Sequence, residues 1–152
     1  MPLFFVKVPT GNYDRNRPVN FGDGQTDLAT ELYLYKLFGN LSVDALLKYS
    51  VRLRNPDTDV TPGNEFSTEW LTTWKISDNF RAGPALNLRI GDDMKQGGHT
   101  LSESGLMKLS LGGEIYYRGF PRSRLSLAVY KDVVTRNSTE GLMVQSRIVI
   151  PF

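Results

Sequence analysis

Few residues in this 152-residue sequence could carry out catalysis. His99 is the single histidine, and Ser102 and Glu103 follow it in a polar stretch. A serine activated by a histidine that a carboxylate orients is a pattern of nucleophilic catalysis. Three near neighbours on one loop do not form a preorganised triad, because such a site needs rigid supporting elements. We therefore expect no catalytic residue and no enzymatic activity.

Metal chemistry has equally little support. The sequence has no cysteine, which excludes disulfides, thiolate zinc sites and a cysteine nucleophile. Asp57, Asp59 and Glu65 lie in one polar segment, and Asp23 and Asp27 in another. Carboxylates of this kind bind hard cations, but their spacing does not match an EF-hand and aspartate is common in turns. We expect solvated loop acids, no metal site and no cofactor.

The elements that position the remaining polar residues are predicted to be strands. From Leu41 to Leu53 apolar residues stand at almost every second position, with Ser42, Asp44 and Lys48 among those between them. Such alternation is the period of a β-strand. The same pattern predicts eight strands, over residues 3–8, 27–38, 41–53, 66–76, 80–90, 106–118, 124–136 and 142–152. We expect one all-β domain over residues 1–152.

The predicted strands are long, and their connections alternate in length. Several strands have about 11 residues or more, which at a tilt near 45° cover about 26 Å, close to the apolar band of an outer-membrane barrel. Short turns are expected at residues 39–40, 77–79 and 119–123, and long polar loops at 10–26, 54–65, 92–104 and 135–140. Transmembrane barrels have short turns on one side and longer loops on the other. The pattern predicts an antiparallel up-and-down transmembrane β-barrel of about eight strands in the bacterial outer membrane.

Aromatic residues fall at strand ends beside the short turns or the chain termini. They are Phe4, Phe5, Phe38, Trp74, Phe80, Phe120 and Phe152. Aromatic rings favour the membrane–water interface, so we predict that these residues form a belt there. The opposite rim carries Arg52, Arg54, Arg89 and Arg136, which suit phosphate groups of lipid or lipopolysaccharide; solvated loop ends are the alternative.

The polar face of a membrane barrel is its lumen, and here that face is predicted to be basic. The basic residues are Lys48, Arg52, Lys75, Arg81, Arg89, Lys108, Arg118, Arg124, Arg136 and Arg147, and the acidic ones are Glu31, Asp44, Glu69, Glu114 and Asp132. Charges enclosed in a protein need partners or water. The basic surplus indicates a weakly anion-favouring interior, and structural ion pairs are the alternative. The whole chain carries only +2, which does not indicate a nucleic-acid partner.

A substrate pathway would use a subset of these lumenal residues. The predicted set comprises Arg81, Arg89, Lys108 and Arg118, which would set the electrostatic field, Glu69 and Glu114, which would pair with them, and Tyr33, Tyr35, Tyr116 and Tyr130, which would offer aromatic contact to a substrate. The expected partners are thus a small molecule and membrane lipid. The oligomeric state is not specified by the sequence.

Several short motifs, taken in order, resemble a known family. They are VKVPTGNYD at 6–14, GDGQTDL at 22–28, GGEIYY at 112–117, RNSTEG at 136–141 and RIVIPF at 147–152. Together they resemble the outer-membrane family described as Putative MetA-pathway of phenol degradation, over nearly the whole chain. The resemblance implies a transporter-like β-barrel that passes small, often aromatic or apolar, molecules. It implies no catalytic residues.

The same resemblance leaves the size of the barrel open. Family members are longer, with more strands and a signal peptide, so the resemblance implies either the C-terminal portion of a larger barrel or a short version. Eight strands enclose an interior that side chains fill, whereas a larger barrel can leave a path. Three hypotheses follow: a passive channel, a plugged eight-stranded barrel with a structural or adhesive role, and a soluble barrel that holds an apolar ligand.

Overall fold

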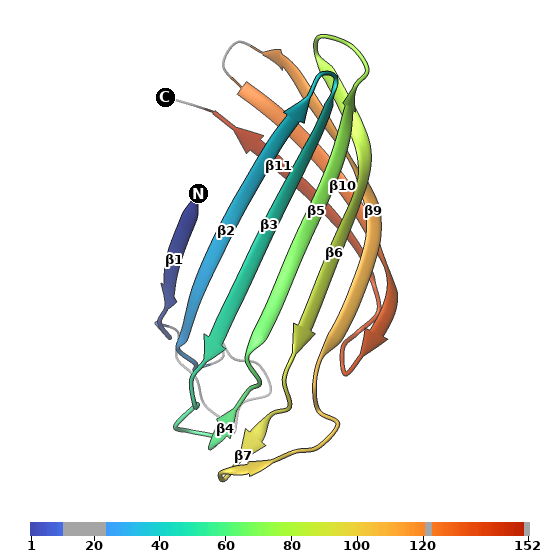
Figure 1. Cartoon of the computed structure of the whole chain (residues 1–152). Coiled ribbons are helices and arrows are strands. Elements are labelled where there is room, and N and C mark those ends of the chain that lie inside the picture. The colour runs from blue at the N-terminus through green and yellow to red at the C-terminus, as the bar shows by residue number, and fades with distance from the viewer. Residues whose placement is uncertain (11–23, 121–122, 151–152) are drawn as a thin grey trace.

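A computed structural model describes residues 1–10, 24–120 and 123–150, and within them eight long strands form one antiparallel sheet (Figure 1). The strands are β1 (Pro2–Lys7), β2 (Asp27–Phe38), β3 (Leu41–Arg52), β5 (Glu65–Lys75), β6 (Phe80–Gly91), β9 (Met107–Phe120), β10 (Ser123–Arg136) and β11 (Leu142–Val149). Each strand pairs with its neighbours along the chain, so the sheet is an up-and-down meander whose edges, among the described strands, are β1 and β11. The predicted all-β, antiparallel up-and-down fold is confirmed.

Three further strands lie outside the main sheet. β4 (Val60–Thr61), β7 (Lys95–Gln96) and β8 (His99–Thr100) form a small three-stranded sheet from two of the long loops. In Figure 1 β4 and β7 lie beyond the lower ends of the long strands, whereas the short turns lie at the upper end. The alternation in the sequence does not predict these strands, because two residues are too few to show a period.

The sheet is curved, and its concave face is polar. Tyr130 on β10 donates a hydrogen bond to Glu69 on β5, although these strands are not neighbours in the sheet. The face that carries both side chains must therefore be the concave one. The buried polar residues Ser42, Thr73, Ser110, Glu114, Ser126 and Asp132 share this face through the strand register.

The convex face is apolar and exposed. Its exposed residues include Leu32, Leu34, Trp70, Trp74, Leu111, Ile115, Leu127, Val129, Val144 and Ile148. A water-soluble barrel places its apolar side chains inside and its charged ones in water, which is the reverse of this arrangement. This arrangement contradicts the hypothesis of a soluble barrel that holds an apolar ligand. An exposed face of this composition is typical of a lipid-facing surface. No helix among the described residues is long and apolar enough to cross a membrane.

A small buried cluster occupies the concave face midway along the strands. It contains Leu71, Ala85, Ala128 and the fully buried Tyr130. Tyr130 pairs across strands with Gly112 of β9. A Cβ atom added at Gly112 would lie 2.0 Å from the backbone oxygen of Val129. Glycine therefore permits the close approach of β9 and β10 beside the tyrosine.

One β-bulge changes the predicted face of a charged residue. The register between β9 and β10 shifts between Asp132 and Val134, and beyond it Arg136 pairs with Met107 of the convex face. The prediction that Arg136 faces the lumen is therefore wrong. A bulge inserts one extra residue into a strand, so every later side chain changes sides.

Candidate functional site

A cavity of about 840 Å³ opens on the concave face at the end of the sheet that carries the short turns. We call this cavity the vestibule. The lining residues include Tyr33, Tyr35, Ser42, Asp44, Thr73, Arg81, Tyr116, Arg118, Arg124, Ser126 and Arg147, with Asn40, Lys75 and Asp78 at the turns. They come from β2, β3, β5, β6, β9, β10 and β11, because alternation turns every second residue of each strand inward.

Arg81 is held in the vestibule by neutral groups. Its Nη2 atom donates to the backbone oxygens of Asn40 at 3.0 Å and Thr73 at 3.2 Å, and its Nε atom donates to Thr73 Oγ1 at 3.2 Å. The Thr73 hydroxyl also contacts the Ser42 hydroxyl at 2.8 Å. This network ties the β2–β3 turn to β5 and β6, and among the described residues no carboxylate forms an ion pair with Arg81.

The acids of the vestibule already have partners. Asp78 pairs with Lys75 at 2.6 Å, and the hydrogen bond from this ammonium group holds the pKa of the Asp78 carboxyl below its usual range. Asp44 accepts a hydrogen bond from the Tyr33 hydroxyl. Both carboxylates are thus engaged at one side of the cavity.

Three arginines of the vestibule have no acidic partner. None of the ion pairs formed between described residues involves Arg118, Arg124 or Arg147. Since Arg81 bonds only to neutral groups, the cavity has a surplus of positive charge. Water or an anion would have to satisfy these guanidinium groups.

Toward the long loops the vestibule is followed by a level of side chains around Tyr130, Glu69 and Glu114, which we call the constriction. The Tyr130 hydroxyl donates to Glu69 Oε1 at 2.7 Å and so links β10 to β5 across the concave face. Glu114 is also buried at this level, and Tyr116 packs against the apolar cluster from the vestibule side. Polar and apolar side chains thus fill the middle of the concave face.

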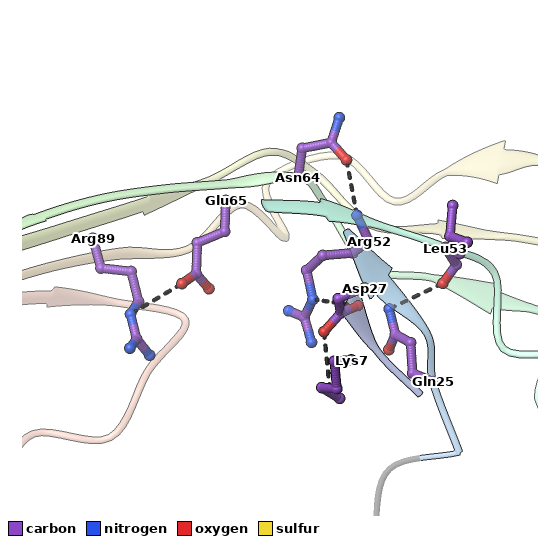
Figure 2. Close-up of polar contacts among 8 residues, drawn as sticks. All are labelled: Lys7, Gln25, Asp27, Arg52, Leu53, Asn64, Glu65 and Arg89. Atoms are coloured by element: carbon purple, nitrogen blue, oxygen red, sulfur yellow. Dashed lines mark hydrogen bonds and ion pairs between the residues drawn. The ribbon is translucent and has the colours of Figure 1, made fainter. Parts of the chain in front are cut away.

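Beyond the constriction, several cations near the long loops are paired with acids. As Figure 2 shows, Asp27 lies between Lys7, at 2.9 Å, and Arg52, at 3.8 Å. Arg89 pairs with Glu65 at 3.2 Å in the same view. These contacts connect β1, β2 and β3 in one group, and β5 and β6 in the other.

Polar contacts of the loops brace the same end of the molecule. Gln25 Nε2 donates to the Leu53 oxygen at 3.0 Å, and the Arg52 amide donates to Asn64 Oδ1 at 3.2 Å (Figure 2). Farther into the loops, Arg54 pairs with Asp59 at 2.6 Å. The rim arginines are therefore engaged within the protein, and their contact with lipid phosphates stays a prediction.

The predicted site residues separate into three levels of the concave face. Arg81, Arg118, Tyr33, Tyr35 and Tyr116 line the vestibule, Glu69, Glu114 and Tyr130 form the constriction, and Arg89 and Lys108 lie toward the long loops. The predicted pairing of the two glutamates with the four cations is not formed. The glutamates stand near the middle of their strands and the cations nearer the ends. Lys108 instead pairs with Asp132 at 2.7 Å.

Sequence reasoning assigned no substrate-pathway role to two arginines and placed one acid wrongly. Arg124 and Arg147 were expected on the lumenal face but not in the substrate pathway, and the structure places both in the vestibule. Glu65, expected as a solvated loop acid, begins β5 and faces Arg89. Extending the alternation by one residue at the start of β5 would have found this acid.

The predicted aromatic belt is only partly at one level. Phe38, Trp74 and Phe80 are exposed on the convex face beside the short turns. β1, however, pairs with the half of β2 nearer the long loops, so Phe4 lies opposite Thr30.

Phe5 also departs from the predicted belt. It faces inward, with the Lys48 ammonium 6.0 Å from the centre of its ring. The prediction that Phe4 and Phe5 belong to the aromatic belt is therefore wrong. The side chain of Phe120, and Phe152 as a whole, lie outside the described residues.

The loop residues considered for catalysis lie apart from this interior. His99 is exposed in β8 and pairs in register with Gln96. Within residues 1–10, 24–120 and 123–150, no group of three or more histidine, cysteine or acidic side chains is arranged to hold a metal ion.

Comparison with solved structures gives a similar fold. The COG4313 outer membrane channel from Pseudomonas putida F1 matches with a TM-score of 0.76 and 14% sequence identity. The match covers 97% of this chain and 56% of that chain, so this sequence spans little more than half of the channel's length. At this identity the likeness concerns the fold. No curated protein matches.

A family model gives the clearest relationship. The model described as Putative MetA-pathway of phenol degradation matches residues 3–148, which is nearly the whole sequence and includes every described strand but the first residue of β1 and the last of β11. The predicted resemblance is thereby confirmed, and the chain belongs to this family.

Proposed function

We propose that this chain forms a β-barrel channel of the bacterial outer membrane, through which small molecules diffuse passively. The observation that carries the proposal is the opposite chemistry of the two faces, with exposed leucine, isoleucine and tryptophan outside and buried polar residues inside. A membrane barrel requires this arrangement, because its outer face meets lipid and its interior holds water. The channel-like fold and the family support a transport role rather than a catalytic one.

In this function the constriction controls passage. The vestibule, on the side of the short turns, would open to the periplasm, since short turns face the periplasm in outer-membrane barrels. A molecule crossing the interior must pass the Tyr130–Glu69 hydrogen bond, which bridges non-neighbouring strands. We propose that the ring of Tyr130, held in place by this bridge, is the barrier and sets the size of what passes.

A plugged barrel with a structural or adhesive role is the second candidate. The buried cluster of Leu71, Ala85, Ala128 and Tyr130 favours it, because these side chains fill the concave face midway along the strands. Eight-stranded barrels generally have interiors that side chains fill. The two candidates differ in one measurable property, which is conductance.

The test is the conductance of the refolded chain in a planar bilayer. A channel should give discrete current steps, whereas a plugged barrel inserted at the same density should give none. Insertion should be checked independently, by protease protection of the refolded chain in liposomes. Inserted protein without current steps would reject the channel and support the plugged barrel.

A further inference from the structure

We propose that the vestibule binds a small aromatic carboxylate. This inference rests on the proposed function, because it takes the concave face to be the interior of a membrane barrel. It adds a ligand class and a location to that function. The argument uses the charge, the lining and the size of the cavity.

The charge of the vestibule is unbalanced in a way that favours one anion. Arg118, Arg124 and Arg147 form no ion pair with any described residue. The nearby Asp78 is paired with Lys75, whereas Asp44 accepts a hydrogen bond from the neutral Tyr33 hydroxyl and keeps its negative charge. The two acids are nevertheless outnumbered by the cationic side chains that line the cavity, which are Lys75, Arg81, Arg118, Arg124 and Arg147. A carboxylate is planar and accepts two parallel hydrogen bonds from a guanidinium group.

Tyrosine side chains line the vestibule beside these arginines. Arg147 of β11 and Tyr116 of β9 both pair in register with Ser126 of β10, so they flank that residue on the concave face. Tyr33 and Tyr35 line the same cavity from β2. Tyr33, Tyr35 and Tyr116 therefore bring aromatic rings close to the positive charges. Aromatic rings stack on one another and on guanidinium planes, so a flat ring bearing a carboxylate matches both features.

The size and shape of the cavity suit a ligand of this kind. Its volume of about 840 Å³ falls within the range of about 300–1,000 Å³ of small-molecule sites. Toward the long loops the cavity is followed by the Tyr130–Glu69 hydrogen bond, which spans the concave face.

The opposite end of the concave face lacks these features. There Arg89 is paired with Glu65, and Lys108 with Asp132. An anion at that end would have to compete with a carboxylate already in place. We therefore place the anion site at the vestibule and not at Arg89 or Lys108.

The test is calorimetric titration of the whole refolded chain, in an uncharged detergent, with three probes. Benzoate carries both ring and charge, benzyl alcohol only the ring, and acetate only the charge. We expect benzoate to bind at least tenfold more tightly than either of the others, after subtraction of a protein-free detergent titration.

The variant for this test is the double substitution Arg124→Gln and Arg147→Gln. Hydrogen bonds to charged groups are each worth about ten- to a hundredfold in affinity, so we expect at least a tenfold loss of benzoate binding. The matched control is Arg54→Gln, since Arg54 is paired with Asp59 in a long loop away from the vestibule. The control should bind benzoate as the unaltered chain does.

Two results would overturn the site. One is equal affinity of the unaltered chain and the folded double variant for benzoate. The other is benzoate binding no tighter than that of benzyl alcohol or acetate. The channel is tested separately from the site. Conductance without benzoate binding would reject the benzoate site but not the channel. Benzoate binding without conductance would reject the channel but not the site.

Discussion

Tyr130 combines two roles in one side chain. Its ring is fully buried among Leu71, Ala85 and Ala128, and its hydroxyl reaches across the concave face to Glu69. The ring therefore occupies the space in which a path would run, and the hydroxyl fixes the ring there. These contributions can be separated by substitution.

Replacing Tyr130 by alanine should widen the interior. We expect the single-channel conductance to rise severalfold for Tyr130→Ala, because the ring is removed from the middle of the concave face. Tyr130→Phe should leave the conductance nearly unchanged, since the ring stays. It should lower the free energy of unfolding by about 1.5–3 kcal/mol, the value of a hydrogen bond to a charged group.

Val129→Ala serves as the control for this pair of variants. Val129 is the preceding residue of the same strand and is exposed on the convex face. Its substitution should leave the conductance unchanged. An equal conductance of the unaltered chain and Tyr130→Ala would place the barrier elsewhere.

Ion preference should depend on the unpaired arginines more than on the paired ones. We expect Arg147→Glu to shift the reversal potential in a salt gradient toward cation preference. Arg89→Glu should have a smaller effect, because Arg89 is paired with Glu65 and half-exposed. Charges in a narrow, poorly solvated path influence ions more strongly than charges in water. An equal shift in both variants would contradict a selective role of the vestibule.

The candidate site was predictable in its composition but not in its arrangement. Alternation alone places Tyr33, Tyr116 and Glu69 on the polar face, and the register confirms that placement. The Tyr130–Glu69 bond joins residues 61 positions apart, on strands separated by two others, and no local pattern carries that information. Which arginines form ion pairs likewise depends on the position of each residue along its strand relative to residues of other strands, and local alternation does not give that position.

At the scale of elements, the close packing of β9 against β10 depends on Gly112. A Cβ atom there would lie 2.0 Å from the backbone oxygen of Val129, whereas one at Gly113 would lie 3.3 Å from the oxygen of Gly83. The neighbouring glycines thus differ sharply in the space around them, and they face opposite sides of the sheet.

Gly112→Ala should separate β9 from β10 and destabilise the fold. We expect the free energy of unfolding in detergent, measured by urea titration, to fall by about 1–3 kcal/mol, as when extra atoms are forced into a packed interior. Gly113→Ala is the matched control, and its effect should be clearly smaller. A larger effect at Gly113 would contradict this account of the strand pairing.

The strands themselves were predicted well from the sequence, and the exceptions have physical causes. Long alternating runs gave the eight main strands, with β2 predicted at its observed bounds, Asp27–Phe38. The bulge between Asp132 and Val134 was missed because the apolar Val133 and Val134 both continue an alternating pattern. β4, β7 and β8 were missed because strands of two residues show no period, and β4 in addition pairs with a loop that lies far away in the sequence.

At the scale of the whole molecule, the apolar convex face predicts how the protein behaves in solution. We expect the chain to stay dispersed only with detergent, and to migrate faster on gels unheated than after boiling. A barrel that resists the gel detergent stays compact until heat unfolds it, and its circular dichroism should be of the β type. These measurements need no ligand and no variant.

Other outcomes of that experiment would have distinct meanings. A monomer that is soluble in plain buffer would contradict the lipid-facing assignment of Leu34, Trp70, Ile115 and Val144. Aggregation in detergent, without a mobility shift, would show that these residues do not complete a stable barrel by themselves.

The two sheet edges, β1 and β11, bear on how such a molecule reaches a membrane. Among the described strands each is paired on one side only, so a row of amide and carbonyl groups on each is left for another partner. Hydrocarbon cannot satisfy these groups, and each costs several kcal/mol there. Strands therefore cannot enter the bilayer one at a time, and insertion and edge pairing must form a single cooperative step. Before that step both edges are templates for aggregation. Binding of the unfolded chain by a chaperone must therefore compete with association of the chains with one another.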